Sequence, residues 1–287
     1  MRVIILFSLM LYSEYYCSQV MESKVSFAKG TLYGYWGYNR SSYSKSNMHF
    51  IGSGYDFTLK GVVAHDNPEK FDPMVYFHPE KLTIPQFNVR LGYYFKDNWA
   101  LSFGYDHMKY LIADRNHVFL NGFISPGIDS VWSGSYTGEE MITNRDEFHY
   151  ENTDGLNYLR FELTYTNQIF KPRNKDWFAL STNTGFSIGA LLSYNDFTFA
   201  GESHSRTISL SGYGLSSHLG LRFEFFKYFF IQPNFGFGFH HQLKVRNRPN
   251  DSSAYTRHAY GYYELDFLIG FLIYTRGKNK CDSCPSW

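Results

Sequence analysis

The feature that most constrains this chain is an alternation of apolar and polar residues with a period of two. In residues 83–95, every second residue from Phe87 to Phe95 is apolar, whereas Asn88 and Arg90 lie between them. Successive side chains of a strand point to opposite faces of a sheet, so this pattern predicts strands. Six more segments alternate in this way: 99–110, 156–170, 177–194, 215–225, 229–243 and 260–274.

The composition of the two faces indicates which medium each one meets. The polar faces are rich in Gly and Ser, which suit the crowded interior of a small barrel. A soluble β-sandwich, the alternative, would favour Lys, Glu and Thr on a face exposed to water. Aromatic residues also mark the strand ends, as in the girdles of outer-membrane barrels. These are Phe95, Trp99, Trp177, Tyr194, Phe225 and Phe229.

The connections between these segments alternate in length, as outer-membrane barrels require. Short ones at 96–98, 171–176 and 226–228 are expected at the periplasmic end. Long ones at 67–82, 113–155, 195–207 and 247–257 are expected outside. Counting strand directions back from the last strand adds strands at 29–40, 45–52 and 55–66. The sequence therefore predicts an all-β antiparallel transmembrane β-barrel of about ten strands, with eight as the alternative.

The two ends of the chain differ from the barrel region. An apolar run at 3–12 follows Arg2 and is too short for a membrane-spanning helix, which needs about 20 residues. It predicts a signal peptide over 1–19, followed by the barrel over 20–276 and a periplasmic tail over 277–287. In an oxidising compartment, Cys281 and Cys284 can form a disulfide. The net charge of +1 argues against nucleic-acid binding.

Several phrases of the sequence resemble a family of exported barrel proteins from Bacteroidota-type outer membranes. They are GYNR (37–40), GSGYDFTL (52–59), TIPQFNVRLGYY (83–94), DHMKY (106–110), HYENTDGLNY (149–158) and FFIQPNFGFG (229–238). The resemblance covers nearly the whole chain after the signal peptide. It implies a barrel in the outer membrane, and it brings no catalytic residues with it.

Charged residues on the polar faces predict a network inside the barrel. If the turn at 96–98 pairs Phe95 with Trp99, then Asn88 lies opposite Asp106 and Arg90 becomes its diagonal neighbour. The expected network is Arg90, Asp106, Arg160, Glu162, Arg222, Glu224, Glu264 and Asp266, with Asp56 and Lys60 as further lumen charges. Mixed signs favour a closed lattice of ion pairs, since ion pores are commonly built from rings of one sign.

A second hypothesis is a hydrolase at the outer mouth, as in outer-membrane proteases of the omptin kind. Asp106 lies near the upper end of its strand, and His149, Glu151 and Asp154 lie where the longest loop re-enters the barrel. A histidine with carboxylates can activate water or bind a metal. Polar anchoring of the loop is the simpler interpretation. Ser216 and His218 share a face but have no evident carboxylate partner, and no motif predicts a metal or cofactor.

The loop at 113–155 is where we expect function. It contains Phe119, Phe123, Ile124, Trp132 and Tyr136, and apolar residues in long barrel loops cover the mouth or meet partners. The first hypothesis is therefore a non-enzymatic outer-membrane barrel, surrounded by lipid, with a largely closed lumen and loops that bind a ligand or a protein. The surface hydrolase and a narrow channel are the alternatives.

Overall fold

The computed structural model describes residues 27–70, 72–76, 78, 85–173 and 177–275. The predicted signal peptide, the tail at 277–287 and both C-terminal cysteines lie outside these ranges. Within them, no helix is long and apolar enough to cross a membrane.

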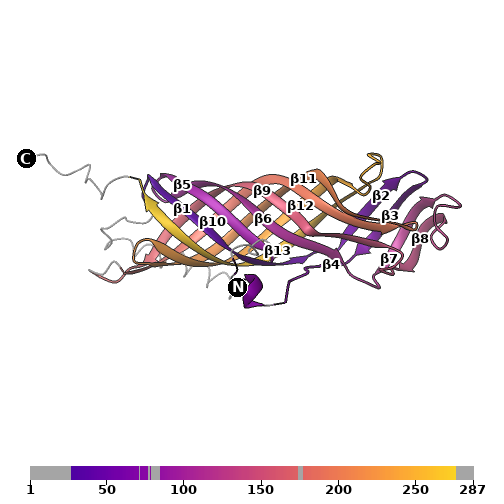
Figure 1. Ribbon diagram of the computed structural model, residues 1–287. Coiled ribbons are helices and arrows are strands. Elements are labelled where there is room, and N and C mark those ends of the chain that lie inside the picture. Colours follow the sequence, from indigo (N-terminus) through magenta and orange to yellow (C-terminus); the bar gives the residue numbers. More distant parts are fainter. Residues whose placement is uncertain (1–26, 71, 77, 79–84, 174–176, 276–287) are drawn as a thin grey trace, which may run out of the picture.

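Eight antiparallel strands of the described chain form a closed ring (Figure 1). They are β1 (Thr31–Tyr43), β5 (Phe87–Lys96), β6 (Trp99–Ile112), β9 (His149–Phe170), β10 (Phe178–Phe199), β11 (Glu202–Phe225), β12 (Phe229–Arg246) and β13 (Tyr255–Tyr274), in that order around the ring. The ring closes where β1 pairs with β13, from Thr31 opposite Tyr274 to Tyr43 opposite Tyr262. The barrel prediction is confirmed, and the ring has the smaller of the two expected strand numbers.

Four further strands continue the sheet beyond the ring. They are β2 (Ser46–Gly52), β3 (Tyr55–Val62), β7 (His117–Ile124) and β8 (Gly134–Ile142). β2 attaches to the top of β13, with Ile51 opposite Tyr255, and β3, β7 and β8 follow in order. We call these four strands the outer sheet. The strand expected at 45–52 and most of the one expected at 55–66 thus exist as β2 and β3, but these two belong to the outer sheet and not to the ring.

The outer sheet stands at one end of the barrel, and β13, the last strand, finishes at the other (Figure 1). At the end where β13 finishes, β5 joins β6 and β11 joins β12 through short turns, whereas the long connections that follow β6 and β12 lie at the other end. Long loops of outer-membrane barrels face the outside, so the outer sheet is extracellular. The expected loop at 195–207 is instead strand, because β10 and β11 run on to a turn at Ala200 and Gly201.

A two-residue strand completes the wall beside the short β5. β4 (Ala64–His65) pairs with Ser42 of β1 and with Leu111 and Ile112 of β6, above the point where β5 begins. The following loop, with the short helix α2 (Pro73–Tyr76), packs on the outside of the wall, where the Tyr38 hydroxyl donates to the Tyr76 carbonyl.

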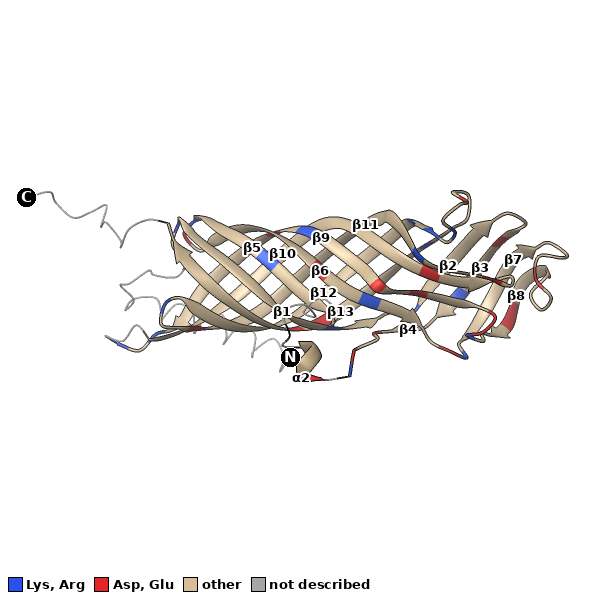
Figure 2. Ribbon diagram, viewed as in Figure 1, with Lys and Arg blue, Asp and Glu red and all other residues tan. Residues whose placement is uncertain are grey.

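An apolar belt covers the outside of the ring. Its predicted lipid-facing members are between 41% and 58% exposed: Leu101, Phe103, Leu163, Leu221, Phe237 and Phe267. Their predicted inward neighbours Ser102, Glu162, Arg222 and Asp266 are buried, which confirms the assignment of faces. Exposed aromatics mark both margins of the belt: Phe95, Trp99, Trp177 and Phe229 at the turn end, and Tyr213 and Tyr263 at the other. Only a few charged residues fall within the barrel wall (Figure 2).

The hairpin of β5 and β6 differs from its prediction at the turn. Trp99 pairs with Lys96 and not with Phe95, because a two-residue turn with Asn98 at φ 70° leaves Phe95 as an extra residue. The register above the turn agrees with the prediction, since Asn88 lies opposite Asp106 and Arg90 opposite Gly104.

The interior changes character along the barrel axis. Within the belt it is mostly polar. Towards the outer end, a large apolar core joins the tops of β9 and β10 to the outer sheet. Rings of Phe50, Phe57, Trp132, Phe148 and Phe199 pack against one another in this core, with the indole of Trp132 stacked on Phe148 at a centroid distance of 5.1 Å.

Candidate functional site

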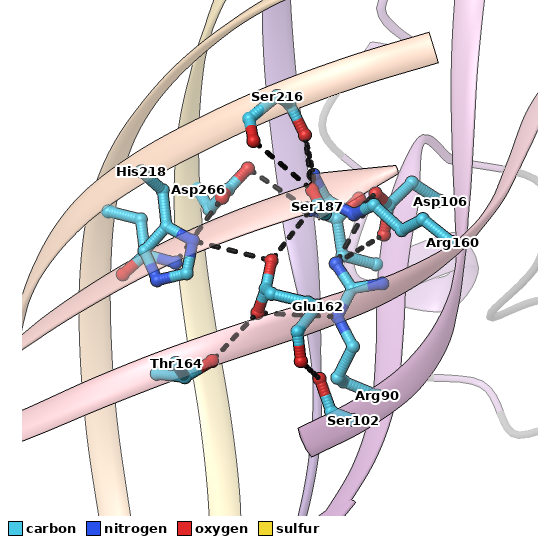
Figure 3. Close-up of polar contacts among 12 residues, drawn as sticks. Arg90, Ser102, Asp106, Arg160, Glu162, Thr164, Ser187, Ser216, His218 and Asp266 are labelled. Atoms are coloured by element: carbon cyan, nitrogen blue, oxygen red, sulfur yellow. Dashed lines mark hydrogen bonds and ion pairs between the residues drawn. The ribbon is translucent and has the colours of Figure 1, made fainter. Parts of the chain in front are cut away.

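The centre of the polar interior is Asp106, which two arginines bind from different strands (Figure 3). Nη2 of Arg90 on β5 donates to both carboxylate oxygens, at 3.0 and 3.3 Å. Nε of Arg160 on β9 lies 2.7 Å from Oδ2. Asp106 therefore neutralises part of two cations that its own neighbouring strands bring into the lumen, which explains why the pattern places it on an inward position.

Glu162 is the second carboxylate of this cluster. It lies 4.0 Å from Arg90 Nε, 3.8 Å from Arg160 Nη2 and 3.4 Å from Nδ1 of His218 on β11. The two carboxylates and two guanidinium groups thus alternate in sign, and each carboxylate contacts both arginines (Figure 3).

The serine and histidine of β11 do not form a nucleophile and base. The hydroxyl of Ser216 contacts Ser187 and accepts from Arg160, whereas His218 contacts Glu162 and the side-chain oxygen of Asn183. The expectation that His218 lacks a carboxylate partner is wrong, because β9 and β11 both flank β10 and their inward side chains meet across it. The hydroxyl of Ser216 nonetheless contacts Arg160 and not His218, so the two residues do not form a catalytic pair.

Arg222 lies nearer the turn end, in a different environment. Its Nε donates to Gln232 at 2.7 Å, its Nη1 donates to the hydroxyl of Tyr94 at 2.9 Å, and its guanidinium carbon lies 4.3 Å from the ring centroid of Phe230. Glu224, the next inward residue on β11, accepts from the Ser181 hydroxyl at 3.5 Å.

Amide and hydroxyl groups donate to the last two carboxylates of the network. Asn88 donates to Asp266 at 3.0 Å and to Glu264 at 3.5 Å, and Ser41 donates to Glu264 at 3.3 Å. The eight predicted members thus comprise three arginines and five carboxylates, a formal charge of 3 − 5 = −2.

Dense packing surrounds this network. All eight side chains belong to residues that are between 0% and 7% exposed. Gly104 illustrates why small residues alternate with charged ones, since a Cβ there would lie 2.0 Å from Nη1 of Arg90. The lumen at this level is filled by side chains.

Two predicted lumen charges lie elsewhere. Asp56 and Lys60 point outward from the outer sheet, where both are exposed, and Asp56 pairs with His49 at 2.5 Å. The reason is that β3 directs Tyr55, Phe57 and Leu59 into the apolar core, so its polar face meets water.

The four catalytic candidates do not form one cluster. Asp106 points into the lumen, whereas Glu151 lies opposite Leu111 on the outward face of the wall. His149 Nε2 lies 3.1 Å from Glu151, and Asp154 pairs with Arg206 at 2.5 Å. No group of three or more His, Cys, Asp or Glu residues in the described chain is arranged to hold a metal.

The outward group has the electrostatics of a structural anchor. Burial raises the pKa of Glu151, but the hydrogen bond and charge of His149, together with Arg145 at 3.7 Å, outweigh it and leave the pKa below its usual value. A carboxylate held in this way stays ionised and accepts hydrogen bonds, which suits the anchoring of the loop where it re-enters the barrel.

No protein-family model matches the chain, and no curated protein matches its sequence. Among solved structures, it is similar to the outer membrane protein OprG of Pseudomonas aeruginosa, with 9% identity, 87% of this chain and 99% of that chain covered, and a TM-score of 0.40. It is also similar to Ail of Yersinia pestis, with 12% identity, 85% of this chain and 99% of that chain covered, and a TM-score of 0.29. For the outer membrane protease OmpT of Escherichia coli the identity is 7%, the coverage is 88% of this chain and 99% of that chain, and the TM-score is 0.26.

The physical evidence for the chain's location lies in its own wall. A closed antiparallel ring leaves no unpaired edge in the hydrocarbon region, and an apolar exterior with aromatic margins surrounds a polar interior. The protein is an integral β-barrel of the outer membrane.

Proposed function

We propose that the protein is a non-enzymatic outer-membrane barrel whose outer sheet binds a partner protein. The observation that supports this most is the exposed surface of β7. Phe119 and Phe123 lie on its outward face and are 51% and 49% exposed. The inward face of the same strand already holds the buried apolar residues Val118, Leu120 and Ile124. Large apolar side chains gathered on an exposed surface are typical of interaction sites.

The neighbouring residues make this surface suitable for a protein. Lys60 lies opposite Phe119 and Asp56 opposite Phe123 on β3, while Glu140 of β8 lies on the other side of Phe119. Exposed aromatics surrounded by charges of both signs resemble the apolar core and polar rim of protein interfaces. The loop at 113–155 thus supplies the central residues of the proposed interface.

The packed interior supports binding over transport. A narrow channel needs a continuous water path, and the charged lumen side chains belong to residues that are at most 7% exposed. We propose accordingly that reconstituted protein gives no steady conductance. Steady open-channel current of fixed amplitude would favour the channel instead.

Site-specific photo-crosslinking in living cells tests the binding proposal. A photoreactive phenylalanine analogue at position 119 or 123 should give a protein adduct of defined mass. The same analogue at Leu91, which is 67% exposed in the apolar belt, should give no such adduct. If the three positions behave alike, or if only position 91 captures protein, the outer sheet is not the interface.

Two related proposals concern the whole chain. Residues 1–19 are a signal peptide that is removed on export to the cell envelope, and the quoted phrases mark membership of the Bacteroidota-type barrel family. Mass measurement of the mature protein tests the first of these.

A further inference from the structure

A cavity of about 450 Å³ opens on the outside of the barrel wall, away from the proposed interface. Five segments build it: the loop after β4, and the strands β6, β9, β10 and β11. Its lining includes Glu69, His107, Lys109, Asp154, Tyr194 and Arg206. Neighbouring side chains of a strand point to opposite faces, so His107 points outward while Asp106 points inward. This cavity is therefore separate from the lumen network.

The residues below the cavity on β6 show where it lies relative to the membrane. The outward positions of β6 are, in ascending order, Leu101, Phe103, Tyr105, His107 and Lys109. The first two belong to the apolar belt, and Tyr105 lies two residues above them. The cavity therefore begins at the upper margin of the belt, at the level of the lipid headgroups.

The opposite rim of the cavity continues into apolar wall. Ile208 and Leu210 follow Arg206 on the descending strand β11 and are 50% and 73% exposed. A molecule held in the cavity can therefore extend an apolar chain down the wall of the barrel. This continuity distinguishes the cavity from an ordinary polar depression on a soluble surface.

The cavity is rich in hydrogen-bond donors with spare capacity. Lys109 is only 5% exposed, and its ammonium donates to Glu69 at 2.8 Å, which uses one of three N–H groups. His107 is 7% exposed, and its Nδ1–H donates to the side-chain oxygen of Asn157, which leaves Nε2 as an acceptor. Arg206 contacts Asp154 through Nε, so both of its terminal nitrogens remain available.

The arginine is also held in place by its backbone. Arg206 has a φ of 53°, a left-handed conformation that is uncommon for a residue with a side chain. Its N–H donates to Asp196 at 2.6 Å, at a point where the pairing of β10 and β11 shifts register. This irregularity fixes the strand at the position whose side chain forms the rim of the cavity.

We infer that this cavity binds the phosphorylated headgroup of an outer-leaflet lipid. Lys109 and Arg206 would donate to the phosphate, because charge-assisted hydrogen bonds from cations are the strongest contacts available to it. Glu69 and Asp154 would accept from hydroxyl groups of the same headgroup. The acyl chains would lie on the wall formed by Phe103 and Leu210.

Lipid retention in nanodiscs tests this inference on the full chain. Discs of phosphatidylcholine are doped with a diphosphorylated glycolipid or with its dephosphorylated form, and bound glycolipid is counted by native mass spectrometry. The wild type should retain the phosphorylated form. K109Q/R206Q should retain it about tenfold less, as loss of charge-assisted hydrogen bonds predicts. The control K244Q/R257Q, which removes two exposed cations outside the cavity, should behave as wild type.

Three further measurements keep the inference falsifiable. R206Q alone changes an exposed side chain that barrel folding does not need, so it should reduce retention even if the double variant assembles poorly. Inorganic phosphate should not displace the glycolipid, and photo-crosslinking from position 119 should be unaffected by R206Q. Equal retention of the dephosphorylated lipid, equal loss in K244Q/R257Q, or complete displacement by inorganic phosphate would each overturn the assignment.

Discussion

The membrane-embedded barrel and the extracellular part of the molecule are built with opposite polarity. In the barrel, Phe103 faces outward and Asp106 faces inward. In the outer sheet, Asp56 and Lys60 face outward and Phe57 faces inward. The comparison shows that one strand pattern serves both parts, because the side that receives the apolar residues is decided by the surrounding medium.

The two interiors also depend on different interactions. The lattice around Asp106 is stabilised by compensation of charge, so that loss of one member leaves others buried and unpaired. The core around Trp132 is stabilised by contact area, so that loss of one member leaves a cavity. The two parts should therefore fail in different ways.

The largest effect is expected from Asp106→Ala. This change removes one of the two carboxylates that Arg90 and Arg160 share and leaves them with Glu162, and it should cost about 3–5 kcal/mol of unfolding free energy. Urea titration in lipid vesicles measures it. Asp154→Ala breaks an exposed ion pair with Arg206 and should cost no more than about 1 kcal/mol. Similar costs for the two variants would contradict the view that the lumen lattice stabilises the barrel.

Trp132→Ala should destabilise the outer end by a similar or smaller amount, about 3–5 kcal/mol, because it removes a buried aromatic side chain. The effect should stay local. Limited proteolysis should cleave the outer sheet, while the barrel still migrates as a folded species in an unheated gel sample. Val131→Ala, at the exposed neighbour, is the control. Loss of the folded barrel band in Trp132→Ala would show that the two parts unfold together.

One substitution placed in both parts compares the two media directly. Phe103 and Phe119 are 49% and 51% exposed, the first to lipid and the second to water. Phe103→Arg should cost about 2–4 kcal/mol in lipid, as for a lipid-facing Arg at mid-bilayer. Phe119→Arg should change the unfolding free energy by less than about 0.5 kcal/mol. Equal costs would mean that one of the two residues is assigned to the wrong medium.

The smallest effect is expected from pH at the re-entry of the loop. The folded pKa of Glu151 lies below its ordinary value of 4.5, so its contribution to stability is full above that value. It is lost as the pH falls through the lower folded pKa. For a partly exposed group this amounts to at most about 1 kcal/mol. Glu151→Gln should remove this part of the acid sensitivity, measured by proteolysis of residues 113–148 between neutral and acidic pH. An unchanged acid profile would assign the sensitivity to other groups.

The strands and their faces were predictable because side chains alternate between the two faces of a strand whatever the strand packs against. The diagonal contact of Arg90 with Asp106 followed from that alternation and the register of a single hairpin. The position of β3 did not follow, since alternation reports that a strand has two faces and not which medium each one meets. The polar face of β3 carries Asp56, Thr58 and Lys60, whereas wall strands carry Gly and Ser, and this difference was a usable signal.

The contacts between distant segments could not be predicted. The carboxylate partner of His218 comes from a strand that is not its hydrogen-bonded neighbour, and the cavity at Lys109 needs a loop that folds back over the wall. Both depend on how the ring curves and on where β5 ends. The pattern of a single strand contains no information on the curvature of the ring or on the end of β5.

The closure of the ring has a consequence for the order of folding. β1 and β13 pair over thirteen positions and join residues as distant in the chain as Thr31 and Tyr274. Contacts of such high sequence separation form slowly, because most of the chain must be ordered first. Until they form, both strands present long unpaired edges that can join to other chains. The final step of assembly should therefore be the slowest, and the nearly complete sheet should be the species most prone to aggregation.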